Sequence, residues 1–198
     1  MDILELNPNP NEIWYTNDSC TNATIPHNLN AFGANIISNT YDFKKQCWVI
    51  SFDKDITIIG DKAFLSCADL TQVVLPDSVR IIESQAFCGC YRMKDIPKAK
   101  NVTYYGFAAF QSCNSLSSIN IPDSVKEIES EAFSQCSNLK KIFCKAKIPP
   151  IGNFFMFNYG NDCKIYVPTE SLDIYKSTDD WSKSFDRIIA CDFNKNSV

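Results

Sequence analysis

Apolar and polar residues alternate along short segments of the chain, and one such segment lies near its middle. Ile119 and Ile121 share one side of this segment, and Ser118 and Asn120 share the other side. A two-residue period of this kind predicts a short strand with one face in a core. Pro122 ends the strand, because proline cannot donate a hydrogen bond to a neighbouring strand.

The same pattern returns every 23 residues, so that columns of equivalent side chains run through four units. The aromatic column consists of Phe64, Phe87, Phe110 and Phe133. An alanine precedes each phenylalanine, and a cysteine follows three positions later, which gives the column Cys67, Cys90, Cys113 and Cys136. No unit can bury its apolar side alone, and stacked units share one core. The repeat therefore predicts a solenoid.

The period extends outward with weaker similarity. Residues 47–52 fall one period before residues 70–75, and residues 165–168 fall two periods after residues 119–122. We therefore predict six stacked units over residues 41–168, within a single domain that spans residues 1–198.

Both ends of such a stack expose apolar surface and need caps. Residues 1–40 are expected to contain a small β cap laid over the strand at 47–52. Residues 169–198 are expected to form a C-terminal cap and tail, in which Thr169 is the N-cap of a helix. Apolar residues at helical spacing, from Leu172 to Trp181, would lie over the last unit.

One unit departs from the pattern at Pro97 and Lys98. Lys98 occupies the column of Leu75 and Ile121, where a lysine cannot stay buried and charged without a partner. Either this rung is distorted, or the Lys98 stem lies along the core while its amine reaches water. We expect a local irregularity in this unit, with one ladder hydrogen bond missing.

The repeat columns, with Pro-Asp-Ser-Val at 76–79 and 122–125, resemble the BspA-like leucine-rich repeats. The segments at 11–16 and 164–168 are similar to the flanks of such arrays, so the resemblance covers nearly the whole chain. It implies a right-handed coil of about six short parallel strands, joined by short turns and 3-10 segments. Members of the family are mostly bacterial surface, adhesion or interaction proteins.

Composition narrows the possible functions. Hydrophobic residues make up 45% of the chain, which is enough for a core, and the net charge of −4 argues against a nucleic-acid partner. The apolar runs are far shorter than the roughly 20 residues that cross a bilayer. The first eight residues lack a positive start and a long apolar stretch, so no signal peptide is predicted.

The ten cysteines invite a disulfide or metal interpretation. The four column cysteines are expected to be free, buried thiols, because stacked neighbours that point the same way seldom reach disulfide geometry. Cys20, Cys163 and Cys191 lie near the ends, and the sequence leaves open whether they pair. Cys88-Gly89-Cys90 has no second pair at zinc spacing, so neither a metal nor a cofactor is predicted.

His27 is the only histidine, and a catalytic Cys–His pair would have to use it. It follows Pro26 in the N-terminal region, where an exposed turn histidine is the simpler interpretation. The rest of a catalytic constellation is missing, and we predict no enzymatic activity.

The strand face that points away from the core is the candidate binding surface. Toward the C-terminal end it gathers two aromatic and two cationic residues, a combination favoured at interfaces. The alternative is that the two aromatic residues pack under the C-terminal cap. The candidate residues are Gln72, Val74, Ser118, Asn120, Lys141, Phe143, Lys164 and Tyr166.

These observations favour a non-enzymatic interaction or adhesion module that binds a macromolecule on its strand face. By resemblance the partner would be a host extracellular or cell-surface protein or glycoprotein, and the module itself would be secreted or at the cell surface. The alternative is an intracellular scaffold or spacer without a dedicated ligand. The free thiols and the lack of a signal peptide favour that cytoplasmic alternative.

Overall fold

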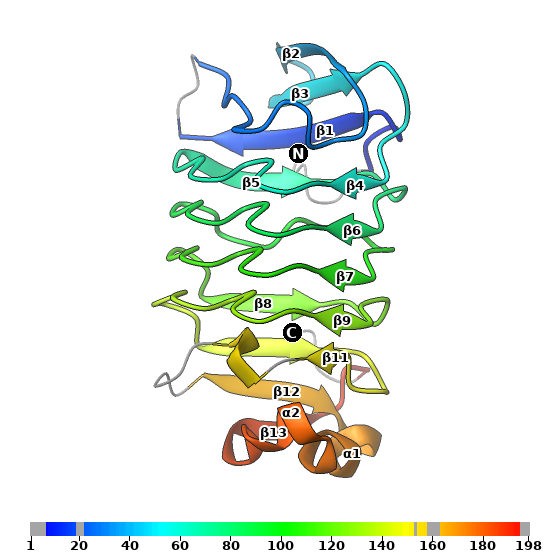
Figure 1. The fold of residues 1–198 in the computed structure, drawn as a ribbon, viewed down its shortest axis with the longest axis vertical. Coiled ribbons are helices and arrows are strands. Elements are labelled where there is room, and N and C mark those ends of the chain that lie inside the picture. The colour runs from blue at the N-terminus through cyan, green and yellow to red at the C-terminus, as the bar shows by residue number, and fades with distance from the viewer. Residues whose placement is uncertain (1–6, 19–21, 153, 158–162, 195–198) are drawn as a thin grey trace.

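The computed structural model describes residues 7–18, 22–152, 154–157 and 163–194. The chain forms one elongated stack of short strands, with β2 and β3 at one end and helices α1 and α2 at the other (Figure 1). The described strands form three sheets, and most repeat units contribute to two of them.

The predicted strands of the later repeat units form a parallel sheet. Its strands are β8 (Ser118–Ile121), β10 (Lys141–Cys144), β12 (Lys164–Pro168) and β13 (Ile188–Cys191). Ile119 pairs with Ile142, and Ile142 pairs with Ile165, so residues one repeat apart lie side by side. β13 adds a strand that the 23-residue pattern does not predict, because it comes from the C-terminal cap.

A second parallel sheet runs along the other side of the core. It consists of β4 (Ile58–Ile59), β6 (Ile81–Ile82), β7 (Tyr104–Tyr105), β9 (Glu127–Ile128) and β11 (Ile151–Gly152). The second residue of β4, β6, β7 and β9 is buried, and the first is more exposed. The sequence indicates inward apolar residues here, but two-residue strands are too short to show an alternating pattern.

The turn that links the two sheets in each unit also repeats in backbone geometry. Each turn holds two residues with positive φ, and Gly89 is the only glycine among them. The two columns are Lys62, Gln85, Ala108 and Glu131, and Ser66, Gly89, Ser112 and Gln135. Backbone hydrogen bonds join successive turns, as from Phe87 N–H to the Ala109 carbonyl at 2.8 Å. These bonds hold strained residues in place one above the other.

The core is built around a ladder of phenylalanine rings. The ring centroids of Phe64, Phe87, Phe110 and Phe133 are 5.2, 5.5 and 5.3 Å apart in turn, with interplanar angles of 8°, 1° and 5°. Phe157 and Trp181 extend the ring contacts into the C-terminal cap. The sequence column is therefore a physical row of stacked side chains.

The N-terminal end differs from the prediction. β1 (Glu12–Asn17) lies between β3 (Cys47–Phe52) and β5 (Leu70–Val74) and is antiparallel to both, while β2 (Ile36–Asp42) covers the outer edge of β3. The prediction that 47–52 stacks directly on 70–75, with the β cap outside it, is therefore wrong. Sequence periodicity misses β1 because an antiparallel strand from outside the repeat has no place in the 23-residue register.

The C-terminal cap is helical, as expected, but its helix is divided. A 3-10 turn (Thr169–Ser171) precedes α1 (Leu172–Ser177), and α2 (Asp179–Ser182) and a second 3-10 turn (Phe185–Arg187) follow. Thr169 is not the N-cap, because it lies inside the first turn. Tyr175 and Trp181 are fully buried and donate hydrogen bonds of 2.8 Å to the carbonyls of Ala146 and Pro150. A further 3-10 turn (Phe154–Met156) precedes β12.

The irregular unit falls where the sequence places it. Residues 93–97 form no strand, and β5 and β8 on either side belong to separate sheets. A single bridge joins Val74 to Lys98, one residue out of the 23-residue register. The extra residue turns Lys98 outward, and Ala99 takes the inward place. The sheet is thus interrupted over a whole rung, a larger change than one missing hydrogen bond.

Candidate binding surface

The structure places the predicted binding residues in two groups on either side of the irregular rung. Ser118, Asn120, Lys141, Phe143, Lys164 and Tyr166 lie on neighbouring strands β8, β10 and β12. Gln72 and Val74 lie on β5, in the other sheet. The first group forms two rows across the strands, and we call it the strand face.

The first row of the strand face is basic. Ser118 pairs in register with Lys141, and Lys141 pairs with Lys164, so the two amines project from adjacent strands. Both lysines are exposed, and neither forms an ion pair with another residue that the structure describes. The Lys145 amine lies 5.9 Å from the ring centroid of Phe193, farther along the same side.

The second row is largely apolar and runs from Asn120 through Phe143 and Tyr166 to Ile189 on β13. The rings of Phe143 and Tyr166 stack with centroids 4.9 Å apart. Phe143 is only 6% exposed, whereas Tyr166 is half-buried. Phe143 is therefore a buried packing residue that stacks on Tyr166, and the expected exposed aromatic pair reduces to the half-buried Tyr166.

Val74 is also buried, which contradicts its place on an open surface. It pairs with Trp14 of β1 and clusters with Trp14, Cys47 and Val49. The Gln72 side chain accepts a 3.4 Å hydrogen bond from the Thr16 hydroxyl. Both residues are engaged by β1, a strand that the 23-residue repeat does not predict, so their contacts within the chain were not expected.

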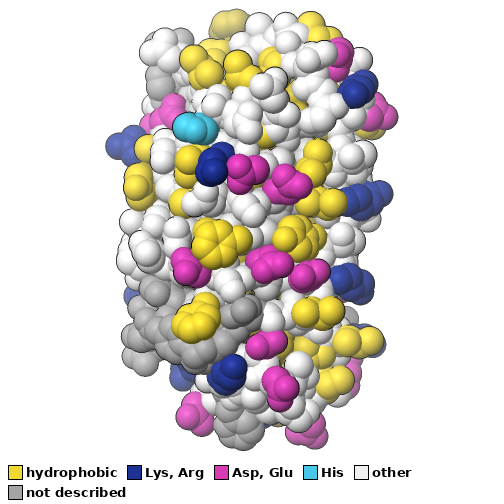
Figure 2. All heavy atoms as spheres, viewed as in Figure 1, with side chains coloured by type: hydrophobic (Ala, Val, Ile, Leu, Met, Phe, Trp, Pro, Cys, Tyr) yellow, Lys and Arg dark blue, Asp and Glu magenta, His cyan; other side chains and the backbone are white. Residues whose placement is uncertain are grey.

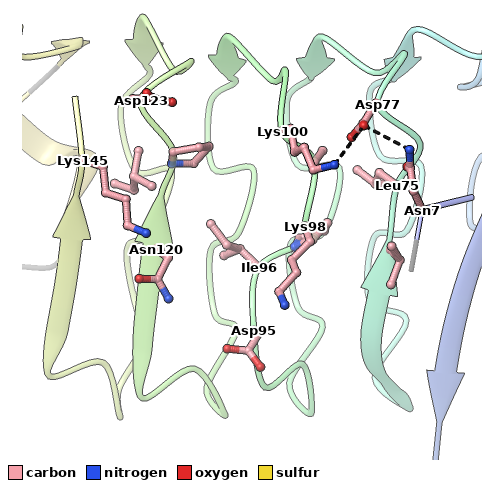
Figure 3. A pocket seen from close by; sticks show the side chains of 15 residues that line it. Asn7, Leu75, Asp77, Asp95, Ile96, Lys98, Lys100, Asn120, Asp123 and Lys145 are labelled. Carbon is pink, nitrogen blue, oxygen red and sulfur yellow. Dashed lines mark hydrogen bonds and ion pairs between the residues drawn. The ribbon is translucent and has the colours of Figure 1, made fainter. Parts of the chain in front are cut away.

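A groove of about 770 Å³ opens beside the irregular rung. Lys98, Asn120 and Lys145 extend into it from successive rungs, while Asp95 lies at one end (Figure 3). Asp77, at the edge, accepts a hydrogen bond from Asn7 at 3.0 Å and lies 3.3 Å from the Lys100 amine. Sequence reasoning missed Lys98 and Lys145 as site residues, although the proline and lysine that interrupt the strand were a usable signal.

The comparisons with known proteins agree with this architecture. Residues 57–178 match, in six copies, the family model described as BspA type leucine rich repeat region. The chain belongs to the BspA-type leucine-rich repeat family. This confirms the resemblance inferred from the repeat columns.

A leucine-rich repeat protein from Bacteroides ovatus is among the similar solved structures, at 20% identity and a TM-score of 0.32. The match covers 84% of this chain and 56% of that protein, so the BspA-type chain spans little more than half of its length. No curated protein matches the sequence.

The cysteines of the BspA-type repeat are packing residues. The thiols of Cys90, Cys113 and Cys136 each donate a 3.2 Å hydrogen bond to the carbonyl of the phenylalanine 26 positions earlier. Burial raises the pKa of all three, to about 12 for Cys136. A thiol with so high a pKa is not a nucleophile at neutral pH.

The end cysteines are unpaired as far as the structure describes them. Cys163 and Cys191 are free and buried, and Cys20 lies outside the described residues. Within the described ranges, no three histidine, cysteine or acidic residues group in a way that could hold a metal ion. His27 is exposed. In that same part of the chain, no helix has the length and apolar character needed to span a bilayer.

Proposed function

We propose that this chain is a non-enzymatic interaction module that binds a macromolecular partner on the strand face. The observation that carries the proposal is the basic row of Lys141 and Lys164 beside the accessible ring of Tyr166. A sheet holds the backbone of these residues one rung apart, so no backbone segment has to become ordered when a partner binds. Lys98 and Lys145, from the adjoining groove, add further positive charge to a protein whose net charge is −4.

The raised thiol pKa values and the exposed position of His27 support the non-enzymatic part of the proposal. The family supports an interaction role. A host extracellular or cell-surface protein, met by a secreted or surface-attached module, is the partner we propose.

The test is a pull-down with the purified chain as bait against host extracellular-matrix proteins. The strand-face variant carries Lys141→Glu, Lys164→Glu and Tyr166→Ser. We expect it to lose the partner that the wild type retains, because two attractive charges become repulsive and the aromatic contact is removed. The matched control carries Lys54→Glu, Lys126→Glu and Tyr91→Ser, which changes the same residue types at exposed positions elsewhere.

Equal retention by both variants would refute the strand face as the binding surface. Thermal unfolding of both variants shows whether either has lost its fold.

An intracellular scaffold is the second candidate, favoured by the free thiols of the nine cysteines that lie within the described residues, since a reducing compartment keeps thiols unpaired. Fractionation of native cells separates the two: recovery in the cytosol alone favours the scaffold, and recovery at the surface favours the adhesion module.

A further inference from the structure

A different face of the molecule carries exposed apolar side chains that the strand face does not explain. The outward column of the second sheet is Ile58, Ile81, Tyr104, Glu127 and Ile151, which lie in register on five adjacent strands. Four of these five residues are apolar or aromatic, although the column points away from the core. Ile81 and Ile151 are 36% and 71% exposed.

Two phenylalanines in the neighbouring turns add to this column. Phe107 follows β7 and is 43% exposed, and Phe155 is 53% exposed. Their carbonyls accept equivalent turn hydrogen bonds, from Gln85 and Glu131 respectively, so the two rings occupy equivalent places in the stack. Exposed large apolar side chains gathered in this way mark interaction sites on soluble proteins.

Carboxylates are interspersed with these side chains, and the view in Figure 2 shows acidic and hydrophobic groups mingled over the surface of the stack. The acidic residues are Glu83, Glu127, Glu129 and Glu131. We call these four residues, with the column above, Phe107 and Phe155, the acidic face.

Neutral donors hold three of these carboxylates, those of Glu83, Glu129 and Glu131, in place. The Tyr104 hydroxyl lies 3.4 Å from Glu129, the Gln111 amide donates to Glu131 at 2.7 Å, and the Asp61 backbone N–H donates to Glu83 at 3.0 Å. Among the described residues, none of the four forms an ion pair with a lysine or arginine. The negative charge of Glu83, Glu129 and Glu131 is therefore held in position, and no described ion pair neutralises any of the four.

Burial and the negative potential of these carboxylates raise the pKa of the Tyr104 phenol. Burial is the largest cause, and the charges of Glu129, Glu127 and Glu83 raise the pKa further. A ring edged by carboxylates suits a cation with an apolar stem, because the amine or guanidinium meets the charge while the stem covers the ring.

We propose that the acidic face is a second docking surface, which binds an extended lysine- or arginine-rich segment of another protein. Charge complementarity selects such a segment over an acidic or neutral one. The site is distinct from the strand face, so the solenoid would hold two partners at once, one on the basic strand face and a cationic one here.

The experiment measures fluorescence anisotropy with a labelled peptide in which arginine alternates with leucine. A peptide of about ten residues reaches roughly 33 Å, more than the roughly 19 Å spanned by five rungs. We expect saturable binding that weakens as salt rises, and no binding of the same peptide with glutamate in place of arginine.

Two variants locate the site. Combined Glu127→Gln, Glu129→Gln and Glu131→Gln should weaken binding about tenfold, and Phe107→Ser about fivefold. The charge control, Asp55→Asn with Asp123→Asn and Asp173→Asn, and the aromatic control, Phe43→Ser, alter exposed residues elsewhere and should bind like the wild type. The strand-face variant should also bind normally, which makes the result independent of the function proposed above.

Several outcomes would overturn the proposal. Absence of binding would do so, as would equal weakening by the two charge variants, because the attraction would then be nonspecific. Full binding by Phe107→Ser would exclude a role for the apolar surface. Sedimentation that shows oligomers abolished by Phe107→Ser would assign the face to a second copy of the chain, and binding of neutral glycans that is lost in the same variant would assign it to sugar.

Discussion

The stacked phenylalanine ladder makes a quantitative prediction, because Phe110 and Phe107 lie on the same turn in opposite environments. Phe110 is fully buried, and its ring packs between Phe87 and Phe133, 5.5 and 5.3 Å away, with the edge of Tyr105 at 5.4 Å. Phe107 is 43% exposed. Replacing each by alanine removes the same atoms from two very different places.

Truncation of a buried phenylalanine to alanine costs about 3–5 kcal/mol, through lost burial and the cavity left behind. Neighbouring rungs fix the rings on both sides of Phe110, so the cavity cannot collapse, and we expect a free energy of unfolding lower by about 4 kcal/mol. At about 3 °C per kcal/mol for a chain of this size, Tm falls by about 12 °C. For Phe107→Ala the expected change is within about 0.5 kcal/mol.

Urea unfolding followed by circular dichroism measures both variants, with the wild type in parallel. The slope of the transition must stay constant for the free energies to be compared. Equal destabilisation by the two variants, or a loss below about 1 kcal/mol for Phe110→Ala, would refute the assignment of the two rings to the core and the surface.

Two further predictions concern the turns and the thiols. Gly106→Ala should destabilise by about 2 kcal/mol in the same assay, because the new Cβ would lie 2.6 Å from backbone atoms of Glu83 and Ser84; an unchanged stability would mean that successive turns are not in close contact. The wild type should lose stability as pH rises from about 9 toward 12, since the pKa of Cys136 is raised from 9.0 to about 12 in the fold and the unfolded chain releases the proton first. Cys136→Ala should make this pH dependence shallower without removing it, because burial also raises the pKa of Cys90 and Cys113, and an unchanged slope would contradict a buried, protonated thiol at Cys136.

The repeat itself was predictable because each column is set by the same physical need in every unit. The phenylalanines and cysteines face one shared core, so their 23-residue spacing carries over directly into stacked rings and thiols. The irregular rung was also predictable from Pro97 and Lys98, since neither residue suits the interior of a strand.

The candidate site was less predictable because its exposure depends on segments outside the repeat. Val74 is covered by Trp14 from β1, and Phe143 lies in a sheet that β13 extends. Neither β1 nor β13 belongs to the 23-residue register. The outward columns were therefore predicted to be exposed, although Val74 and Phe143 are buried. The acidic face was missed for a related reason: its strands have two residues each, and its two phenylalanines, Phe107 and Phe155, come from turns.

β1 is an interior strand of its sheet, although it comes earlier in the chain than both of the strands that it pairs with. It is synthesised before either neighbour, yet it cannot take its place until β5, which ends at Val74, has left the ribosome. Deleting Glu12–Asn17 would remove the strand that joins β3 to β5 and leave one edge of each strand unpaired. Proteolytic cleavage within β1 should therefore destabilise the fold more than removal of a terminal cap, because it would leave two strand edges, those of β3 and β5, without a hydrogen-bonding partner.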